Sequence, residues 1–324
     1  MRVLRLLPVR HRGLATKAAA AGLSFHIVEG PHTLEPAIEG ILRETETRQG
    51  LVGLPPCNKR PVSIVAKTSD GRPAGGIYGY TNWNELHLSL FAANPECRVR
   101  GMGKALLLHM EEVVCANLGC NRMGLETFSW QARPFYEKLG FTVFGTQSNQ
   151  PRGHDKYFME KVWPAGEGKH ARGEGYRGAA VDLKMENWEK NAAFDQLNIW
   201  LDGDTQNRNI AGVPPYDMVP FAMTVKDAAS GEVVAYCVYE TWWSELRVDK
   251  LVVVPDQQHR GIGTAVLQRL EEMARAKGLN QLVADTMSWQ ARGFYEKHGF
   301  TVFATQHDMP IGHSRLRFVR PVHP

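Results

Sequence analysis

The stretch "WQARPFYEKLGFTVFGTQ", residues 130–147, occurs twice in this chain: residues 289–306 read "WQARGFYEKHGFTVFATQ" and differ at only three positions. Aromatic residues and glycines recur in register, which indicates a duplicated supersecondary unit. The similarity extends upstream, where "NPECRVRGMGKALLLHMEE" from Asn94 corresponds to "VPDQQHRGIGTAVLQRLEE" from Val254. Two such long units indicate two domains rather than a solenoid, which stacks many short repeats.

A chain of 324 residues is long enough for two domains that each bury a core. We expect a first repeat over residues 24–163 and a second repeat over residues 180–324. Residues 164–179 between them are rich in Gly and charge and almost free of apolar side chains, which predicts a solvated linker.

The first 23 residues are Arg-rich, free of acidic residues and rich in small side chains. This composition is typical of a mitochondrial or plastid transit peptide, and the alternative is a disordered extension of a cytoplasmic protein. The basic residues of this segment account for the formal charge of +4. The remaining chain is close to neutral, so we expect no nucleic acid partner.

The five cysteines show no CxxC spacing, so the sequence predicts neither a disulfide framework nor a metal site. No apolar run approaches the ~18 residues of a membrane span, so we expect no membrane segment.

Both repeats show the same order of elements. Residues 61–67 and 75–80 flank the turn sequence "SDGRP", and residues 218–226 and 232–240 flank "DAASG", which predicts a hairpin in each repeat. Helices are expected before the hairpins, from about residue 33 to 48 and from about residue 187 to 205. Further strands and helices alternate after them, which predicts an α/β (α+β) fold with a sheet covered by helices.

The turn after the fourth strand of each repeat reads "RVRGMG" or "QHRGIG". Its glycines, Gly101 and Gly103 or Gly261 and Gly263, let the backbone bend tightly and approach a ligand. The helix that follows presents unpaired N–H groups and its positive dipole end, so such a turn can hold a pyrophosphate. A single GxG is more often a tight turn, but its recurrence after a strand that ends in Pro favours a binding function.

This order, with "YEKxGF" in the last helix, resembles the GNAT superfamily of N-acetyltransferases once in each repeat. The resemblance implies two tandem GNAT-like domains, each a mixed, mostly antiparallel sheet flanked by helices. It also implies acetyl-CoA as co-substrate. Residues that would contact its phosphates are Arg98, Val99, Arg100, Gly101, Met102, Gly103 and Lys104 in the first repeat and Gln258, His259, Arg260, Gly261, Ile262, Gly263 and Thr264 in the second.

The tyrosine of "YEKxGF" is Tyr136 or Tyr295. The resemblance implies that it lies near the CoA sulfur and can protonate the departing thiolate, a general-acid role that a phenol can perform. The alternative is an amphipathic ring packed in the core. The matched context in both repeats favours the acid.

Acetylation of an amine also needs a base. The resemblance points to Glu126 and Asp285 on the fifth strand of each repeat. Strand alternation places His87 on the same face as Glu85, which makes it the second candidate; its counterpart, Arg247, could not act as a base.

Ser129 and Ser288 stand where the family often has an Asn that hydrogen-bonds the cofactor, and Ser reaches less far. His154 and His313, in "PRGH" and "PIGH", are expected to be structural, with substrate contact as the alternative.

We therefore expect an acetyl-CoA-dependent N-acetyltransferase that acts on a primary amine of a small molecule by direct attack in a ternary complex. Two alternatives stay open: acetylation of a protein lysine or N-terminus, or an acyl-CoA-binding module in which one or both repeats are not catalytic.

Overall fold

The computed structural model describes most of both repeats. The described residues are 22–29, 35–48, 59–97, 99–163, 184–187, 190–207, 213–215 and 217–322. The segment 1–23, expected as a transit peptide or extension, lies outside them apart from its last two residues, and the expected linker lies outside them entirely. None of the described helices is both long and apolar enough to cross a membrane.

The chain folds into two compact units that are each built from separate segments. The major unit combines residues 53–216 and 284–320, and the minor unit combines residues 1–52, 217–283 and 321–324. The units thus cut across both repeats and do not coincide with the contiguous domain boundaries expected from the sequence. Two contacts between the repeats, described below, account for this: an exchange of N-terminal elements and the pairing of β13 (Thr301–His307) with β6 (Thr142–Ser148).

The major unit holds a mixed sheet. Its described strands are β2 (Pro61–Lys67), β3 (Pro73–Asn82), β4 (Glu85–Ala93), β5 (Arg122–Phe128), β6 (Thr142–Ser148), β7 (Asp155–Val162), β8 (Lys184–Asn187), β13 (Thr301–His307) and β14 (Ser314–Pro321). They follow the order β8-β2-β3-β4-β5-β7-β6-β13-β14. Among these neighbouring strands, β4 and β5 pair in parallel and the other pairs are antiparallel. Its helices are α2 (Met102–Asn117), α3 (Arg133–Glu137), α4 (Lys190–Asn207) and α6 (Arg292–Lys297).

The minor unit holds the antiparallel order β1-β9-β10-β11. Its elements are β1 (Leu23–Glu29), α1 (Glu35–Arg48), β9 (Val219–Asp227), β10 (Val233–Trp242), β11 (Glu245–Val253), the short 3₁₀ helix η2 (Pro255–Gln257) and α5 (Ile262–Ala276). Strand β12 (Gln281–Met287) passes from the minor into the major unit after Val283.

The expected α/β fold with mixed, mostly antiparallel sheets is confirmed, and so are both hairpins and both helices that follow a glycine turn. The helix boundaries move slightly, to Glu35–Arg48 and Lys190–Asn207. Strands β7 and β14 were not expected from the sequence, because their mixed polar and apolar residues reflect a polar cluster that both strands help to build.

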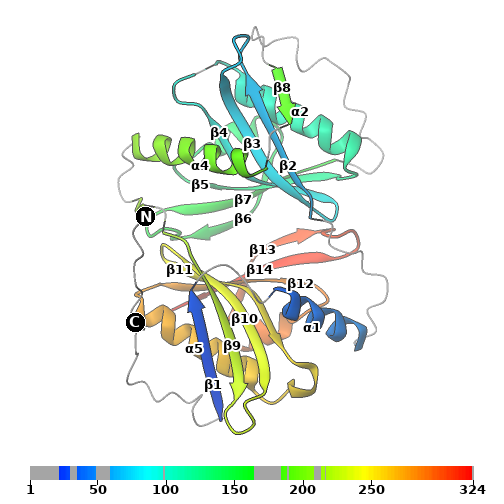
Figure 1. Ribbon diagram of the computed structural model, residues 1–324, viewed down its shortest axis with the longest axis vertical. Helices are drawn as coiled ribbons and strands as arrows, with labels where there is room; N and C mark the ends of the chain where they lie inside the picture. Colours follow the sequence, from blue (N-terminus) through cyan, green and yellow to red (C-terminus); the bar gives the residue numbers. More distant parts are fainter. Residues whose placement is uncertain are drawn as a thin grey trace. The chain divides into compact units, whose positions relative to one another are not determined.

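Each repeat adds its first strand and helix to the sheet that the other repeat supplies. In the minor unit, β1 pairs along its whole length with β9, and α1 packs on β11 (Figure 1). In the major unit, β8 pairs with β2, and α4 lies across β3 and β4 (Figure 1). Ile38 of α1 is fully buried with Val238 and Val252, while Leu197 of α4 is fully buried with Tyr78 and Ala92.

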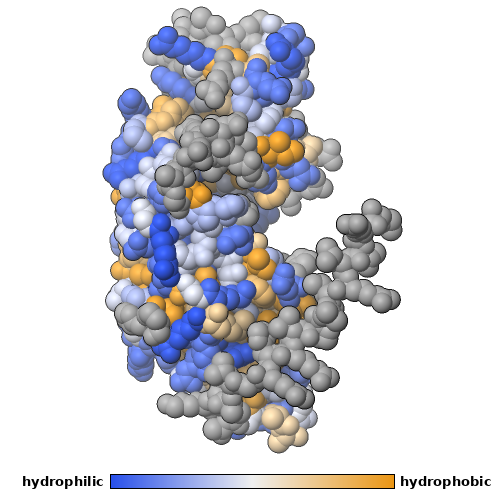
Figure 2. All heavy atoms as spheres, turned by 90° about the vertical axis from the view of Figure 1, so that its left-hand side faces the viewer, coloured by the Kyte–Doolittle hydropathy of each residue, from blue (hydrophilic) through white to orange (hydrophobic). Residues whose placement is uncertain are grey.

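The main core of the major unit lies between α2 and the sheet. It includes Ile64, Ile77, Leu86, Leu106 and Met123, all almost completely buried. On the face shown in Figure 2, hydrophobic side chains are scattered among hydrophilic ones rather than gathered in one broad patch.

The two repeats meet in the major unit where β13 pairs antiparallel with β6. The register places Ala304 opposite Gly145. These residues occupy equivalent positions in "FTVFATQ" and "FTVFGTQ". Pairing of equivalent residues is the pattern of a two-fold, isologous contact, here made within one chain.

Candidate active site

The glycine turn of the first repeat leads directly into α2. Gly101 has φ +83°, a left-handed conformation that side chains rarely adopt, and α2 begins at the next residue. A Cβ at Gly103 would lie 3.3 Å from the Phe91 ring and 3.5 Å from the Phe135 ring. The turn therefore needs glycine both for its backbone conformation and for close packing.

The other residues predicted to contact phosphates lie just before α2 or in its first turn. Arg100 and Lys104 are exposed, while Met102 is buried and Val99 is half-buried. Arg98 lies outside the described residues. No acidic side chain lies in the first turn of α2, so nothing there offsets its positive end.

The second repeat repeats this geometry in the minor unit. Gly261, with φ +81°, caps α5, and the first turn of that helix also lacks acidic residues. Gln258 Nε2 donates to the Val253 carbonyl at 3.1 Å and to Thr45 Oγ1 of α1 at 3.5 Å. Arg260 hydrogen-bonds Gln257, and His259 adopts φ +61°. Ile262, Gly263 and Thr264 form the first turn of α5.

Strands β4 and β5 separate beside the first glycine turn. They pair from Glu85 with Arg122 to Leu88 with Leu125, although β4 continues to Ala93 and β5 to Phe128. At the same point β4 carries a bulge, because Leu88 pairs with Gly79 and Leu90 with Tyr78, which leaves Ser89 outside the ladder with β3. This bulge could not be expected from the sequence, since none of its residues is a type that signals a special backbone conformation. An equivalent bulge occurs in β11 at Asp249.

Tyr136 lies close to the first glycine turn through Phe91. The Phe91 ring is 6.4 Å from the Tyr136 ring and 6.0 Å from the Phe135 ring, which contacts the site of Gly103. Burial raises the pKa of Tyr136 above its ordinary value, because an apolar environment disfavours the phenolate.

Tyr295 lies in the major unit, whereas the glycine turn of its repeat lies in the minor unit. The tyrosine is buried, with its ring 5.4 Å from Phe300 and 5.6 Å from Phe318.

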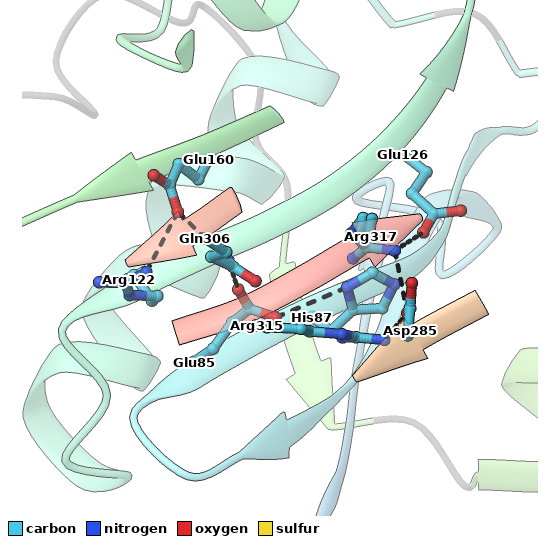
Figure 3. Close-up of polar contacts among 9 residues, drawn as sticks. All are labelled: Glu85, His87, Arg122, Glu126, Glu160, Asp285, Gln306, Arg315 and Arg317. Carbon is cyan, nitrogen blue, oxygen red and sulfur yellow. Dashed lines mark hydrogen bonds and ion pairs between the residues drawn. The ribbon is translucent and has the colours of Figure 1, made fainter. Parts of the chain in front are cut away.

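The carboxylates Glu126 and Asp285 contact buried cations. Glu126 forms an ion pair with Lys156, and Asp285 forms one with Arg315. Arg317 Nη1 bridges both acids, at 3.3 Å from Glu126 Oε1 and 3.4 Å from Asp285 Oδ2 (Figure 3). These contacts stabilise the carboxylates as anions and favour a structural role for them. Arg317 itself could not be predicted from the duplication, since the first repeat has Phe158 at the equivalent position.

His87 lies in the same polar cluster, on the face of β4 opposite Leu86 and Leu88. Its Nδ1 is 3.7 Å from Glu85 Oε1, and its ring is 5.3 Å from the Tyr80 ring. The side chain keeps 15% of its surface exposed. His87, Glu126 and Asp285 are thus brought together (Figure 3). Tyr136 packs instead against the core that contains Leu86 and Leu88, which alternate with His87 along β4.

Ser129 and Ser288 bind the backbone of the last strand in each repeat. Ser129 Oγ accepts from the Asp155 N–H at 3.3 Å, and Ser288 Oγ accepts from the Ser314 N–H at 3.1 Å. Ser129 Oγ also lies 3.3 Å from Nδ1 of His154. These contacts fix the turn that follows β5 or β12.

Comparisons with known proteins find the same family in both repeats. The family model described as "Acetyltransferase (GNAT) family" matches residues 38–141 and again residues 184–300. Over 110 residues the chain is 27% identical to a blasticidin-S acetyltransferase of Streptomyces morookaense, which covers 33% of this chain and 81% of that protein. Over 100 residues it is 31% identical to a glucosamine 6-phosphate N-acetyltransferase of Trypanosoma brucei brucei, covering 28% and 67%.

Among solved structures, an acetyltransferase from Bacillus cereus is 28% identical, with a TM-score of 0.35, over 42% of this chain and 96% of that one. The family match spans most of the chain and includes both glycine turns and both tyrosines. This chain is therefore an acyltransferase that belongs to the acetyltransferase (GNAT) family and carries two tandem copies of its domain.

Proposed function

We propose that this protein transfers an acetyl group from acetyl-CoA to a primary amine of a small molecule, by direct attack, in the first repeat. One observation carries the proposal: the bulge at Ser89 lies where β4 and β5 separate, and Phe91, two residues further along β4, lies against both Tyr136 and Gly103 of the glycine turn. When bound, acetyl-CoA would supply the acetyl group as a thioester, and CoA would leave through its sulfur, which takes up a proton as the bond breaks.

The start of α2 suits the phosphates of this co-substrate. The first-turn N–H groups of a helix have no intrahelical acceptor and carry partial positive charge. The left-handed Gly101 brings the backbone around so that these groups can face an anion. Exposed Arg100 and Lys104 add full positive charges beside them.

The bulge in β4 supplies donors for the reacting carbonyl. A bulge leaves the extra residue outside the ladder, so backbone N–H groups around Ser89 can donate to an oxygen that becomes negative during attack.

Two side chains on opposite faces of the sheet move the protons. As the amine nitrogen bonds to the acetyl carbon, His87 Nε2 accepts a proton from that nitrogen. As the carbon–sulfur bond breaks, Tyr136 gives its hydroxyl proton to the sulfur. Both protons are accounted for, and neither step requires Glu126 or Asp285, whose carboxylates contact cations.

The small-molecule acceptor is supported by the names of two relatives, which refer to blasticidin S and to glucosamine 6-phosphate. Each relative corresponds to about a third of this chain, as expected if one repeat is a sufficient domain.

The test is a calorimetric titration with acetyl-CoA. We expect two sites, of which Gly101→Val removes one and Gly261→Val the other. Gly71→Val is the matched control, because Gly71 has φ +84° and open surroundings but lies in the β2–β3 turn. A single site would assign binding to one repeat, and no binding at all would refute the proposal.

The acceptor is tested by turnover on separate panels of small amines and of peptides, with His87→Gln as the comparison. Thiol release that depends on a small amine and falls in this variant would support the proposal. Turnover confined to peptides would show that the acceptor is a protein lysine or N-terminus and not a small-molecule amine.

A further inference from the structure

Glu85, beside the proposed base, is a carboxylate with 1% exposure, and the first repeat makes room for it with a glycine. A Cβ at Gly124 would lie 2.7 Å from Oε2 and 2.9 Å from Cδ of Glu85. The second repeat has Val283 at the position equivalent to Gly124. The equivalent carboxylate of the second repeat, Glu245, is also 1% exposed, so both repeats bury a carboxylate here, and in the first repeat Gly124 makes room for it.

The donor that holds Glu85 comes from the second repeat. Nε2 of Gln306, on β13, donates to Glu85 Oε2 and to Glu160 Oε2, the latter at 3.2 Å (Figure 3). Gln306 is 2% exposed, and Glu160 is held in turn by Arg122 Nη1 at 3.2 Å. Both N–H bonds of the Gln306 amide are thus directed at carboxylates that are themselves fixed.

The other oxygen of Glu85 faces Nδ1 of His87 at 3.7 Å. Gln306 hydrogen-bonds the Glu85 side chain, and His87 lies within ion-pair distance of it. Other groups that interact with the pair include Tyr80 on β3 and, through their charges, Glu160 on β7 and two arginines of β14, Arg315 and Arg317, both of which contact Asp285. Gln306 is therefore the neutral group that determines where the carboxylate lies beneath the imidazole.

We propose that Gln306 of the second repeat is a positioning residue for the active site of the first: it holds Glu85 so that the carboxylate accepts from Nδ1–H of His87. This inference rests on the proposed role of His87. A carboxylate on Nδ1 fixes the tautomer and leaves Nε2 free to accept a proton. The second repeat thus completes the active site of the first, whatever its own turnover.

The test is ¹⁵N NMR of the full-length protein labelled at histidine, read for the tautomer of His87. His87→Gln identifies its signals. We expect the Nδ1–H form in the native protein and its loss in Gln306→Met, which keeps the side-chain length but has no donor. Gln147→Met is the matched control, since Gln147 is the equivalent residue of β6 and is also 2% exposed. It should leave the His87 tautomer unchanged.

A second variant, Gly124→Ala, displaces the Glu85 carboxylate without removing any hydrogen-bonding group and should also abolish the Nδ1–H form. It keeps the test decisive if Gln306→Met does not fold. A native His87 in the Nε2–H form, or an Nδ1–H form that persists in both variants, would overturn the inference. Because the readout is not turnover, it is distinct from the proposed function, which fails if His87→Gln acetylates amines at the native rate.

Discussion

Tyr136 carries a hydroxyl proton in a mostly aromatic environment formed by Phe91 and Phe141. Since burial raises its pKa, the hydroxyl stays protonated at neutral pH and can serve as a proton donor to a thiolate. Tyr136→Phe removes the proton but keeps the ring. We expect kcat to fall about 10²-fold or more while the Kd for acetyl-CoA changes little, as measured by steady-state kinetics and calorimetry.

The same change in the second repeat, Tyr295→Phe, reports whether that repeat turns over substrate. A loss of rate confined to Tyr136→Phe would place the chemistry in the first repeat. If even the double variant keeps the native rate, neither tyrosine is the general acid.

Glu85 makes the unfolding free energy of the protein decrease as the pH falls into the acidic range. Burial alone would raise its pKa, but interactions with His87, Arg315 and Gln306 outweigh burial and hold the pKa below its ordinary value of 4.5. A lowered folded-state pKa means that the ionised group stabilises the fold above pH 4.5 and that this contribution is lost as pH falls through the folded value. Glu85→Gln should therefore flatten the decline of the unfolding free energy below that pH in urea titrations.

Glu160, in the same cluster, has a pKa shifted in the direction opposite to that of Glu85, so the pH dependence of its contribution to stability is also opposite. Burial raises its pKa, so its contribution to stability is present at low pH and is lost as pH rises through the folded value. In urea titrations, the native protein should lose unfolding free energy through Glu160 as the pH rises, and Glu160→Gln should remove this loss. Equal pH slopes in the two variants would contradict both assignments.

At the scale of elements, the exchange of N-terminal segments links each helix to the sheet of the other repeat. Ile38→Ala, on α1, should cost about 2–5 kcal/mol and reduce hydrogen-exchange protection chiefly in β10 and β11, where its partners Val238 and Val252 lie. Leu197→Ala, on α4, should instead reduce protection in β3 and β4, which carry Tyr78 and Ala92. If each variant weakened the strands of its own repeat, the exchange would be wrong.

Local patterns in the sequence predicted the elements because hairpin turns, helical periodicity and glycine caps depend on neighbouring residues. Gly140 and Gly299, the glycines of "YEKxGF" that follow the last helix of each repeat, have φ of +89° and +79°. The partner of β1 could not be predicted in this way, since its residues specify a strand but not the sheet edge that it joins. The expectation for Glu126 and Asp285 rested on the family resemblance and strand position, whereas the cations that pair with them lie on other strands, β7 and β14, that are separated from them in the sequence.

At the scale of the whole molecule, the duplication brings equivalent positions of the two repeats together and lets them differ. Arg317 stacks on Phe158, its equivalent, with Cζ 4.3 Å from the ring centroid. The same guanidinium contacts Glu126 and Asp285, which are also equivalent. Two arginines or two phenylalanines at these positions could not make this set of contacts. The divergence of the two repeats at this position therefore makes the contact specific to the pairing of the first repeat with the second.

The closest approach of the repeats depends on a missing side chain. A Cβ on Gly145 would collide with the Cβ of Ala304 and lie 3.2 Å from its Cα, and both atoms belong to paired strands that cannot easily move apart. Gly145→Ala should therefore lower the unfolding free energy by about 1–3 kcal/mol in urea titrations. Ala304→Gly, at the equivalent position, exchanges the two residues across the contact and should restore most of that loss in the double variant. Gly40→Ala is the control, because its Cβ would meet nothing within 4 Å in α1. A double variant no more stable than Gly145→Ala would show that the two repeats do not meet at these residues.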